Sequence, residues 1–135
     1  MSSLADDVAT AIIARWSTAF GKLDAAALSS LYSNNAFFFG SKSRLFRGTD
    51  GVAEYFNTLP RWAAPAVRFS DMTTAQVNPG LINFAATATF TVERGAEPLS
   101  VKITWVIARE DGGWKIVSHH VSSQTPLLSD PPASA

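Results

Sequence analysis

Two adjacent histidines, His119 and His120, are the side chains of this sequence best suited to acid/base chemistry near neutral pH. Both lie in the segment DGGWKIVSHHVSSQTP, residues 111–126, and the 135 residues contain no other histidine. An imidazole, with a pKa of about 6.5, can exchange a proton or hold a ligand by a hydrogen bond. The alternative is that both are ordinary strand residues, bonded to the backbone or packed in a subunit contact. The face of the strand that each one occupies decides between these interpretations.

The residue inventory excludes several other kinds of reactive site. The chain has no cysteine, which excludes disulfides, thiolate nucleophiles and zinc–cysteine sites. Neighbouring strand residues point to opposite faces, so the two histidines cannot chelate one ion, and Glu54 is the main carboxylate expected near an inner face. No acid is evidently placed to orient either histidine in a nucleophilic triad. We therefore expect neither a metal nor a cofactor.

Charge and hydropathy limit the classes of partner. Eleven basic residues balance eleven acidic residues, without a basic stripe that could bind a nucleic acid. The N-terminal segment MSSLADDVAT carries two aspartates where a signal peptide needs positive charge. No segment approaches the roughly 20 apolar residues of a membrane span. We expect a soluble, cytoplasmic protein that binds neither nucleic acid nor membrane.

Helical spacing of apolar residues predicts three helices in the first half of the chain. The first covers residues 4–20, and the second is the segment AAALSSLY, capped by Asp24. Two short strands, AFFFG and SRLFRG, follow around the turn SKS. The third helix begins at Thr49 or Asp50 and ends at Leu59 before a proline. Its buried face is predicted to consist of Val52, Tyr55, Phe56 and Leu59.

The second half of the chain has the two-residue period of strands. The predicted strands are separated by the turn segments NPG, RGAEP and EDGG and cover residues 67–77, 81–92, 99–109 and 114–123. Helices followed by a meander of long strands indicate an α+β domain, with the helices on one face of an antiparallel sheet. We expect one domain over residues 1–126 and a disordered Pro- and Ser-rich tail over residues 127–135.

Alternation of apolar residues defines the inner face of two of these strands. In residues 81–92 the even positions are apolar, and the small side chains of Ala86 and Ala88 leave room above the middle of that face. In residues 99–109 the odd positions, which include Trp105, are apolar. Trp105 is therefore expected either in the core or on the wall of a ligand cavity.

The length of the last hairpin loop decides the direction of the histidines. A three-residue loop, residues 111–113, pairs Trp105 with His119, so that His119 points inward and His120 outward. A two-residue Asp-Gly loop shifts the register and turns His120 inward. The two consecutive glycines favour the three-residue loop. A ligand held by neutral His119 is then expected to loosen at about pH 6, where the ring protonates.

Three segments together resemble the nuclear-transport-factor-2-like superfamily, which includes SnoaL-like proteins. They are GKLDAAALSSLYSNNAFF, FRGTDGVAEYF and ITWVIAREDGGWKIVSHHVSSQTP, and the similarity runs over roughly residues 5–126. The last segment is most similar to the association domain of calcium/calmodulin-dependent kinase II. The resemblance implies a cone, in which a strongly curved antiparallel sheet wraps around N-terminal helices (a cystatin-like fold). Such cones commonly dimerise through the sheet, and many bind or transform a small molecule.

The resemblance also carries expectations for single positions. The cavity arginines of the kinase association domain correspond to Trp105 and Val121. Both positions are odd-numbered, like His119, which supports an inward His119. Neither residue is an arginine, which argues against an anion pocket. The catalytic aspartate of related ketosteroid isomerases corresponds to about Gly40, so that general base is missing. The Asp–Arg–Asp cluster of hydrolases with this fold has no counterpart.

We therefore predict a domain that binds a small, largely apolar molecule. One alternative is an isomerase, cyclase or dehydratase with His119 as acid/base and Tyr55 as donor, and another is a structural oligomerisation domain. Trp62 is expected to close the mouth of the cone or to cover its rim. The expected ligand-binding residues are Tyr55, Trp62, Ala88, Trp105, His119 and Val121. A homodimer is expected through the outer sheet face, with Thr89, Trp114, Ile116 and His120 in the contact.

Overall fold

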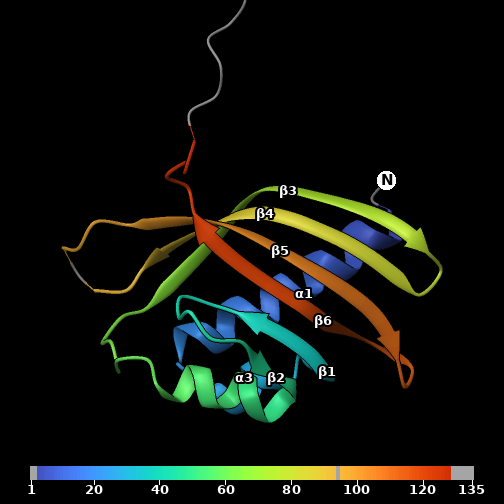
Figure 1. Cartoon of the computed structure of the whole chain (residues 1–135), viewed down its shortest axis with the longest axis horizontal. Coiled ribbons are helices and arrows are strands. Elements are labelled where there is room, and N and C mark those ends of the chain that lie inside the picture. The colour runs from blue at the N-terminus through green and yellow to red at the C-terminus, as the bar shows by residue number, and fades with distance from the viewer. Residues whose placement is uncertain (1–2, 94, 129–135) are drawn as a thin grey trace, which may run out of the picture.

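The computed structural model describes residues 3–93 and 95–128 (Figure 1). These described residues form three helices and six strands. The helices are α1 (Leu4–Gly21), α2 (Ala25–Ser29) and α3 (Gly48–Asn57). The strands are β1 (Tyr32–Phe39), β2 (Phe46–Arg47), β3 (Ala66–Asn78), β4 (Leu81–Thr91), β5 (Leu99–Glu110) and β6 (Gly113–Ser123).

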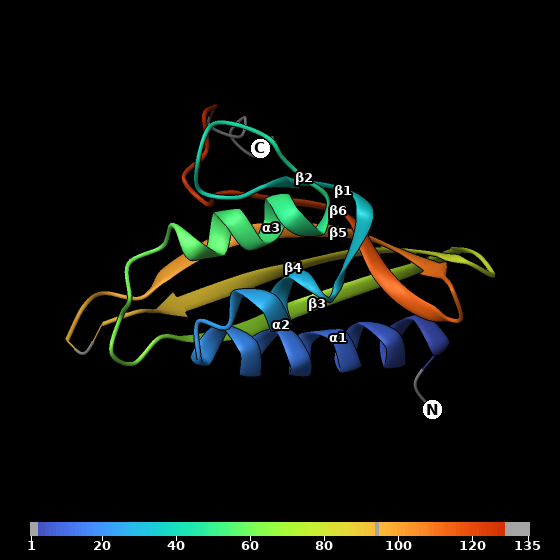
Figure 2. The ribbon, with the colours of Figure 1, turned by 90° about the horizontal axis from the view of Figure 1, so that it is seen from below.

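All six strands form one curved, open sheet in the order β2-β1-β6-β5-β4-β3. Strands β3 to β6 are antiparallel neighbours, whereas β1 runs parallel to β6. Helix α1 packs along β3, and α3 packs against β1 and β2, so both helices lie on the concave side (Figure 2). The predicted α+β class, with a curved sheet wrapped around the helices, is confirmed. Among the described residues, no helix has the length and apolar character needed to cross a membrane.

Side-chain hydrogen bonds cap the starts of α1 and α2 but not that of α3. Asp24 caps α2 as predicted and Ser3 caps α1, because their side-chain oxygens accept the N–H groups three residues later. The predicted cap of α3 is wrong, since the helix begins at Gly48 and Thr49 instead donates to Asn34. At Gly48, φ is +67° and a Cβ would lie 2.8 Å from the Asn34 carbonyl oxygen, so glycine lets α3 approach β1 closely.

The predicted second helix is too long. It ends at Ser29, and Tyr32, expected in its last turn, is the first residue of β1. The main chain there pairs with β6, where the Ile116 N–H donates to the Leu31 carbonyl at 2.9 Å. Pairing with a strand that is distant in sequence therefore overrides the local helical preference.

The hairpin between β5 and β6 differs from the prediction. Glu110 pairs with Gly113, so the loop consists of the two residues Asp111 and Gly112. Their φ angles of +51° and +79° are those of a type I′ turn, which suits the twist of a two-residue hairpin. The predicted three-residue loop is wrong.

A β-bulge restores the register that the predicted loop would have given. Ile107 pairs with Ile116 but Val106 pairs with Ser118, so Val117 is the extra residue of β6. Trp105 consequently pairs with His119, as predicted. The bulge also brings Ile116 to the concave side, where it is completely buried, and its predicted place on the outer face is wrong.

A cluster of aromatic side chains in the core is centred on Trp16 of α1. The Trp16 ring contacts aromatic rings from α1, α3 and three strands, namely Phe20, Phe56, Phe69, Phe90 and Trp105. The predicted inner face of β4 is confirmed by the burial of Ile82, Phe84 and Ala88. Residues 129–135 of the predicted disordered tail lie outside the described residues.

Candidate functional site

A cavity of about 430 Å³ lies between the helices and the concave face of the sheet. Its walls come from α1, the ends of β1 and α3, and strands β4 to β6. Most of the lining is apolar, with aromatic side chains of Trp16, Phe20, Phe38, Tyr55, Phe56, Trp62 and Phe90. Of the described residues that line it, only Lys42 and Glu97 carry a formal charge. The volume falls within the range of small-molecule sites, roughly 300–1,000 Å³.

His119 stands on the wall of this cavity at the end of a buried chain of hydrogen bonds. Its side chain is 3 % exposed. Trp105 Nε1 donates to His119 Nδ1 at 2.9 Å, and Tyr32 Oη lies 2.8 Å from the same nitrogen. The Tyr32 hydroxyl in turn accepts from Trp16 Nε1 at 2.9 Å. Four side chains from α1, β1, β5 and β6 therefore form one network.

These contacts fix the tautomer of the imidazole. An indole N–H can only donate, so Nδ1 accepts and carries no proton, and the proton of the neutral ring is on Nε2. Phe38 stacks on the ring at 4.0 Å between centroids and helps to hold its orientation. Turning the ring over would place a carbon against both donors.

The Nε2–H group of His119 faces the cavity. Within residues 3–93 and 95–128, every buried side-chain nitrogen and oxygen has a hydrogen-bond partner, and both contacts of His119 are made by Nδ1. Nε2 is therefore accessible, and the surface that His119 presents is part of the cavity wall. The site thus holds one oriented donor in a mostly apolar wall.

Burial keeps this donor neutral. Loss of hydration, together with a smaller effect of the neighbouring His120, lowers the pKa of His119 to about 3. Burial likewise raises the pKa of Tyr32 above its usual range. The expected protonation of His119 at about pH 6 is therefore wrong. An imidazole with such a pKa is a weak base at neutral pH, but it can hold and polarise a carbonyl as a neutral donor.

Tyr55 and Gly40 form a second part of the wall. The Tyr55 hydroxyl lies 2.7 Å from Ser41 Oγ and accepts from the Ser41 N–H at 3.0 Å. A Cβ on Gly40 would come within 2.6–2.7 Å of the rings of Tyr55 and Phe38. Position 40, where the resemblance places the aspartate of ketosteroid isomerases, thus has no room for a side chain beside these rings.

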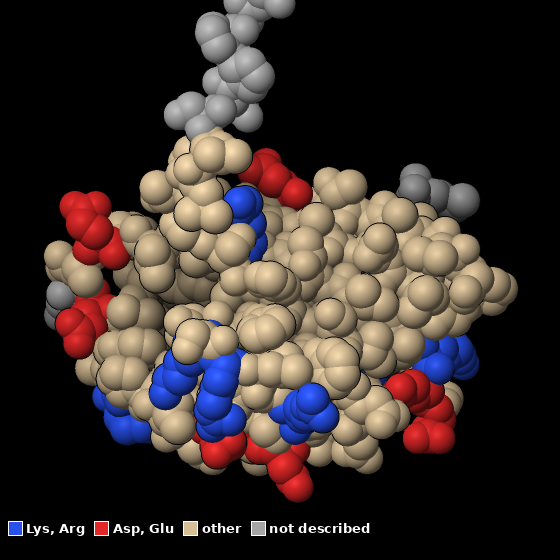
Figure 3. All heavy atoms as spheres, viewed as in Figure 1, with Lys and Arg blue, Asp and Glu red and all other residues tan. Residues whose placement is uncertain are grey.

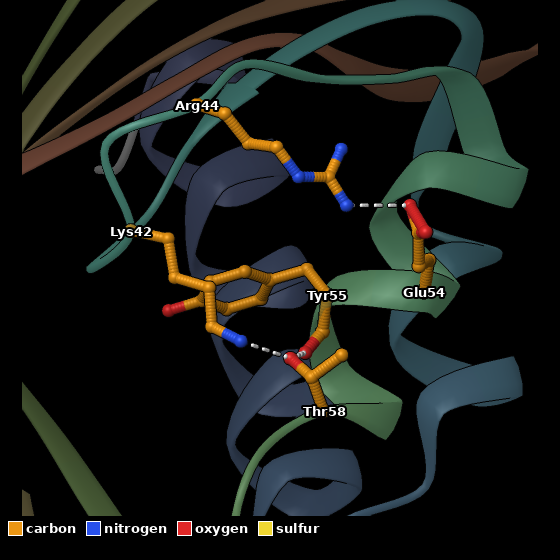
Figure 4. A network of polar contacts seen from close by, with 5 residues as sticks. All are labelled: Lys42, Arg44, Glu54, Tyr55 and Thr58. Atoms are coloured by element: carbon orange, nitrogen blue, oxygen red, sulfur yellow. Dashed lines mark hydrogen bonds and ion pairs between the residues drawn. The ribbon is translucent and has the colours of Figure 1, made fainter.

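Polar side chains near the mouth bond to one another. Lys42 Nζ donates to Thr58 Oγ1 at 2.8 Å, and Thr58 Oγ1 donates to the Tyr55 carbonyl at 2.6 Å (Figure 4). Glu54, the carboxylate expected near an inner face, is 56 % exposed and pairs with Arg44 at 3.0 Å on the outer side of α3 (Figure 4). Among the described residues, no group of three or more His, Cys, Asp or Glu side chains could hold a metal ion.

The structure brings four of the six expected ligand-binding residues to the cavity. These are Tyr55, Trp62, His119 and Val121. Ala88 and Trp105 are fully buried and are not part of the lining, but Trp105 acts on the site through its bond to His119. Sequence reasoning missed Trp16, Tyr32 and Phe38. The sequence placed Trp16 in the first helix, Phe38 in the strand AFFFG and Tyr32 in the second helix, and no signal marked any of them as part of a cavity or its network.

The residues expected in a dimer contact separate into two groups. Thr89 and His120 lie on the convex face, where Thr89 bonds to Ser100 at 2.8 Å and exposed His120 lies beside Phe39. Trp114 does not lie on the convex face, because it precedes the bulge and shares the concave side with Ile116. Its predicted place on the outer face is wrong. Figure 3 shows a broad uncharged area over the strands of the convex face, with most charged side chains at its margin.

Comparison with known proteins identifies the family. The SnoaL-like domain model matches residues 9–126, whereas no curated protein sequence matches the chain. A Xanthomonas campestris structure named for the calcium/calmodulin-dependent protein kinase II association domain superposes with a TM-score of 0.81 at 19% identity, covering 93% of this chain and 91% of that chain.

Two structures from Novosphingobium aromaticivorans have the same fold. An NTF2-like protein with a cystatin-like fold gives a TM-score of 0.77 at 15% identity, over 90% of this chain and 82% of that one. A protein provisionally named an aromatic ring hydroxylase gives a TM-score of 0.78 at 13% identity, covering 93% of this chain and 94% of that chain. At these identities the likeness concerns the fold. Because the SnoaL-like domain model matches most of the chain, the chain belongs to the SnoaL-like domain family.

Proposed function

We propose that this protein binds a small, largely apolar molecule in the cavity and associates as a homodimer through the convex face of the sheet. The observation that carries the first part is an aromatic-walled cavity of about 430 Å³ with one oriented N–H donor in its wall. Apolar cavities with few, fixed polar groups are typical of small-molecule sites. The polar group orients the ligand, and the aromatic walls supply most of the binding free energy.

Binding is favoured over acid/base catalysis by the polar groups of the wall. An isomerase or dehydratase needs a base close to the reacting carbon. The low pKa of His119 makes it a weak base, and Gly40 leaves no space for a carboxylate beside Tyr55. Glu97 is the one carboxylate among the described lining residues, and it is exposed on the loop between β4 and β5.

Filling the cavity is expected to weaken ligand binding. We expect the neutral probe 2-ethylnaphthalene to bind the wild type, measured by the change in tryptophan fluorescence. Val121→Phe places a ring in the cavity and should weaken binding by at least about 10-fold, since a comparable apolar volume is excluded. The matched control Val77→Phe lies on an exposed part of β3 and should bind as the wild type does. Equal binding by both variants would place the probe elsewhere.

A charge on the convex face is expected to dissociate the dimer. Sedimentation at micromolar concentration should give twice the 14.5 kDa mass of the chain. Thr104→Arg puts a charge opposite His120 on the convex face, so it should shift the protein toward monomer. Ala14→Arg, on the exposed side of α1, is the control and should leave the mass unchanged. A wild type that sediments only as a monomer contradicts the dimer.

A further inference from the structure

We infer that the ligand of this cavity is an uncharged molecule with a flat, ring-bearing body and one acceptor oxygen, such as a ketone carbonyl, which accepts the Nε2–H of His119. The inference rests on the proposed function and names the class of molecule that the same site would take. It follows from the polarity of the buried network, the charge of the cavity wall and the shape of that wall.

The polarity of the network allows only an acceptor at His119. Trp16 donates to Tyr32, and Trp105 donates to His119 Nδ1. Neither indole can reverse its bond, since an indole nitrogen has no lone pair to offer. Tyr32, which already accepts from Trp16, directs its own hydrogen toward Nδ1. With Nδ1 held as an acceptor, Nε2 of the neutral ring can only donate, so an ammonium group or another pure donor finds no partner there.

The charges around the cavity argue for a neutral ligand. An anion that reached His119 would lose its hydration among apolar side chains, and no buried cation is among the described lining residues. Lys42 is exposed, and its ammonium group is bonded to Thr58. Protonation of His119 to meet the anion is opposed by its burial. A neutral carbonyl avoids these costs and still accepts the hydrogen bond.

The shape of the wall argues for a flat ring system. Phe38 stacks on His119 and Tyr55 packs at 4.7 Å from Phe38, so aromatic faces and edges surround the donor. Trp62 lies 6.4 Å from Phe20 at another part of the same wall. A cavity of about 430 Å³ accommodates roughly two or three fused rings. Aromatic walls favour such rings through stacked and edge contacts.

Three probes of one size separate this inference from the proposed function. They are 2-acetylnaphthalene, which has a carbonyl, 2-ethylnaphthalene, which lacks it, and 2-naphthoate, which is charged. Their dissociation constants for the wild type are measured by calorimetry at pH 7. We expect the ketone to bind about 5- to 10-fold more tightly than the hydrocarbon, as one hydrogen bond provides, and the carboxylate to bind most weakly.

A spectroscopic measurement on the wild type avoids dependence on a variant that fails to fold. The infrared carbonyl band of bound 2-acetylnaphthalene should move to lower wavenumber than the band of the free ketone in hexane. In His119→Phe, where folded, the preference for the ketone over the hydrocarbon should disappear. Equal affinity for ketone and hydrocarbon with an unshifted carbonyl band overturns the inference while the proposed function stands. Tightest binding of naphthoate also overturns it, and binding of none of the three probes contradicts the proposed function itself.

Discussion

Replacing His119 by alanine is expected to lower the free energy of unfolding by about 3–4 kcal/mol, because two buried donors lose their acceptor and a cavity is left. Within the described part of the chain, Trp105 Nε1–H has no other hydrogen-bond partner, and the Tyr32 hydroxyl loses the nitrogen 2.8 Å away. Urea denaturation monitored by circular dichroism measures the change. Ser122→Ala, an exposed site on the same strand, is the control and should change stability by less than about 0.5 kcal/mol.

The conservative variant His119→Gln distinguishes the hydrogen bonds from the volume of the ring. Its side-chain carbonyl can accept from Trp105 or Tyr32, so part of the stability lost in His119→Ala should return. If His119→Ala unfolds within about 1 kcal/mol of the wild type, the network contributes little and the imidazole is not fixed by it.

The stability of the folded protein is expected to fall as the pH decreases from about 6.5 toward 3. His119 has a pKa of about 3 in the folded protein, and a histidine in an unfolded chain has a pKa of about 6.5. Between these values the unfolded chain binds a proton at this residue and the folded chain does not. Unfolding is therefore favoured as the pH falls, by up to about 1.4 kcal/mol per pH unit.

Comparison with His119→Gln isolates this effect from the carboxylates, which also titrate at low pH. Between pH 7 and pH 5 the wild type should lose about 2 kcal/mol more stability than His119→Gln, which has no group that titrates at this position. Urea denaturation at pH 7, 6 and 5 measures the difference. Parallel losses in the two proteins would mean that His119 titrates normally in the folded state.

The inner faces of the sheet could be predicted because burial repeats every second residue. Ile82, Phe84 and Trp105 were placed correctly by this alternation alone. The same rule failed in β6, where Val117 is an extra residue and reverses the parity between Ile116 and His119. A bulge leaves no mark in the composition and could not be predicted. The two-residue loop and the one extra residue together give the same register as the predicted three-residue loop, which is why the inward direction of His119 was predicted correctly from a wrong loop.

The network behind His119 could not be predicted, since it depends on contacts between residues far apart in sequence. Tyr32 lies 87 positions before His119, and the sequence placed it in the last turn of the predicted second helix. Trp16 belonged to an apolar stripe, which marks it as buried but not as a donor to Tyr32. The expected protonation at about pH 6 failed for the same reason, because the extent of burial sets the pKa.

The nitrogen-15 NMR spectrum of the His119 side chain tests most directly whether a fixed, neutral donor stands on the cavity wall. In uniformly labelled protein between pH 7.5 and pH 5, we expect Nε2 to carry the proton and Nδ1 to be unprotonated, with neither shift changing over this range. His120, exposed on the other face of the strand, serves as the internal reference. A proton on Nδ1, or titration of His119 near pH 6.5, would contradict the buried network and the oriented donor it holds.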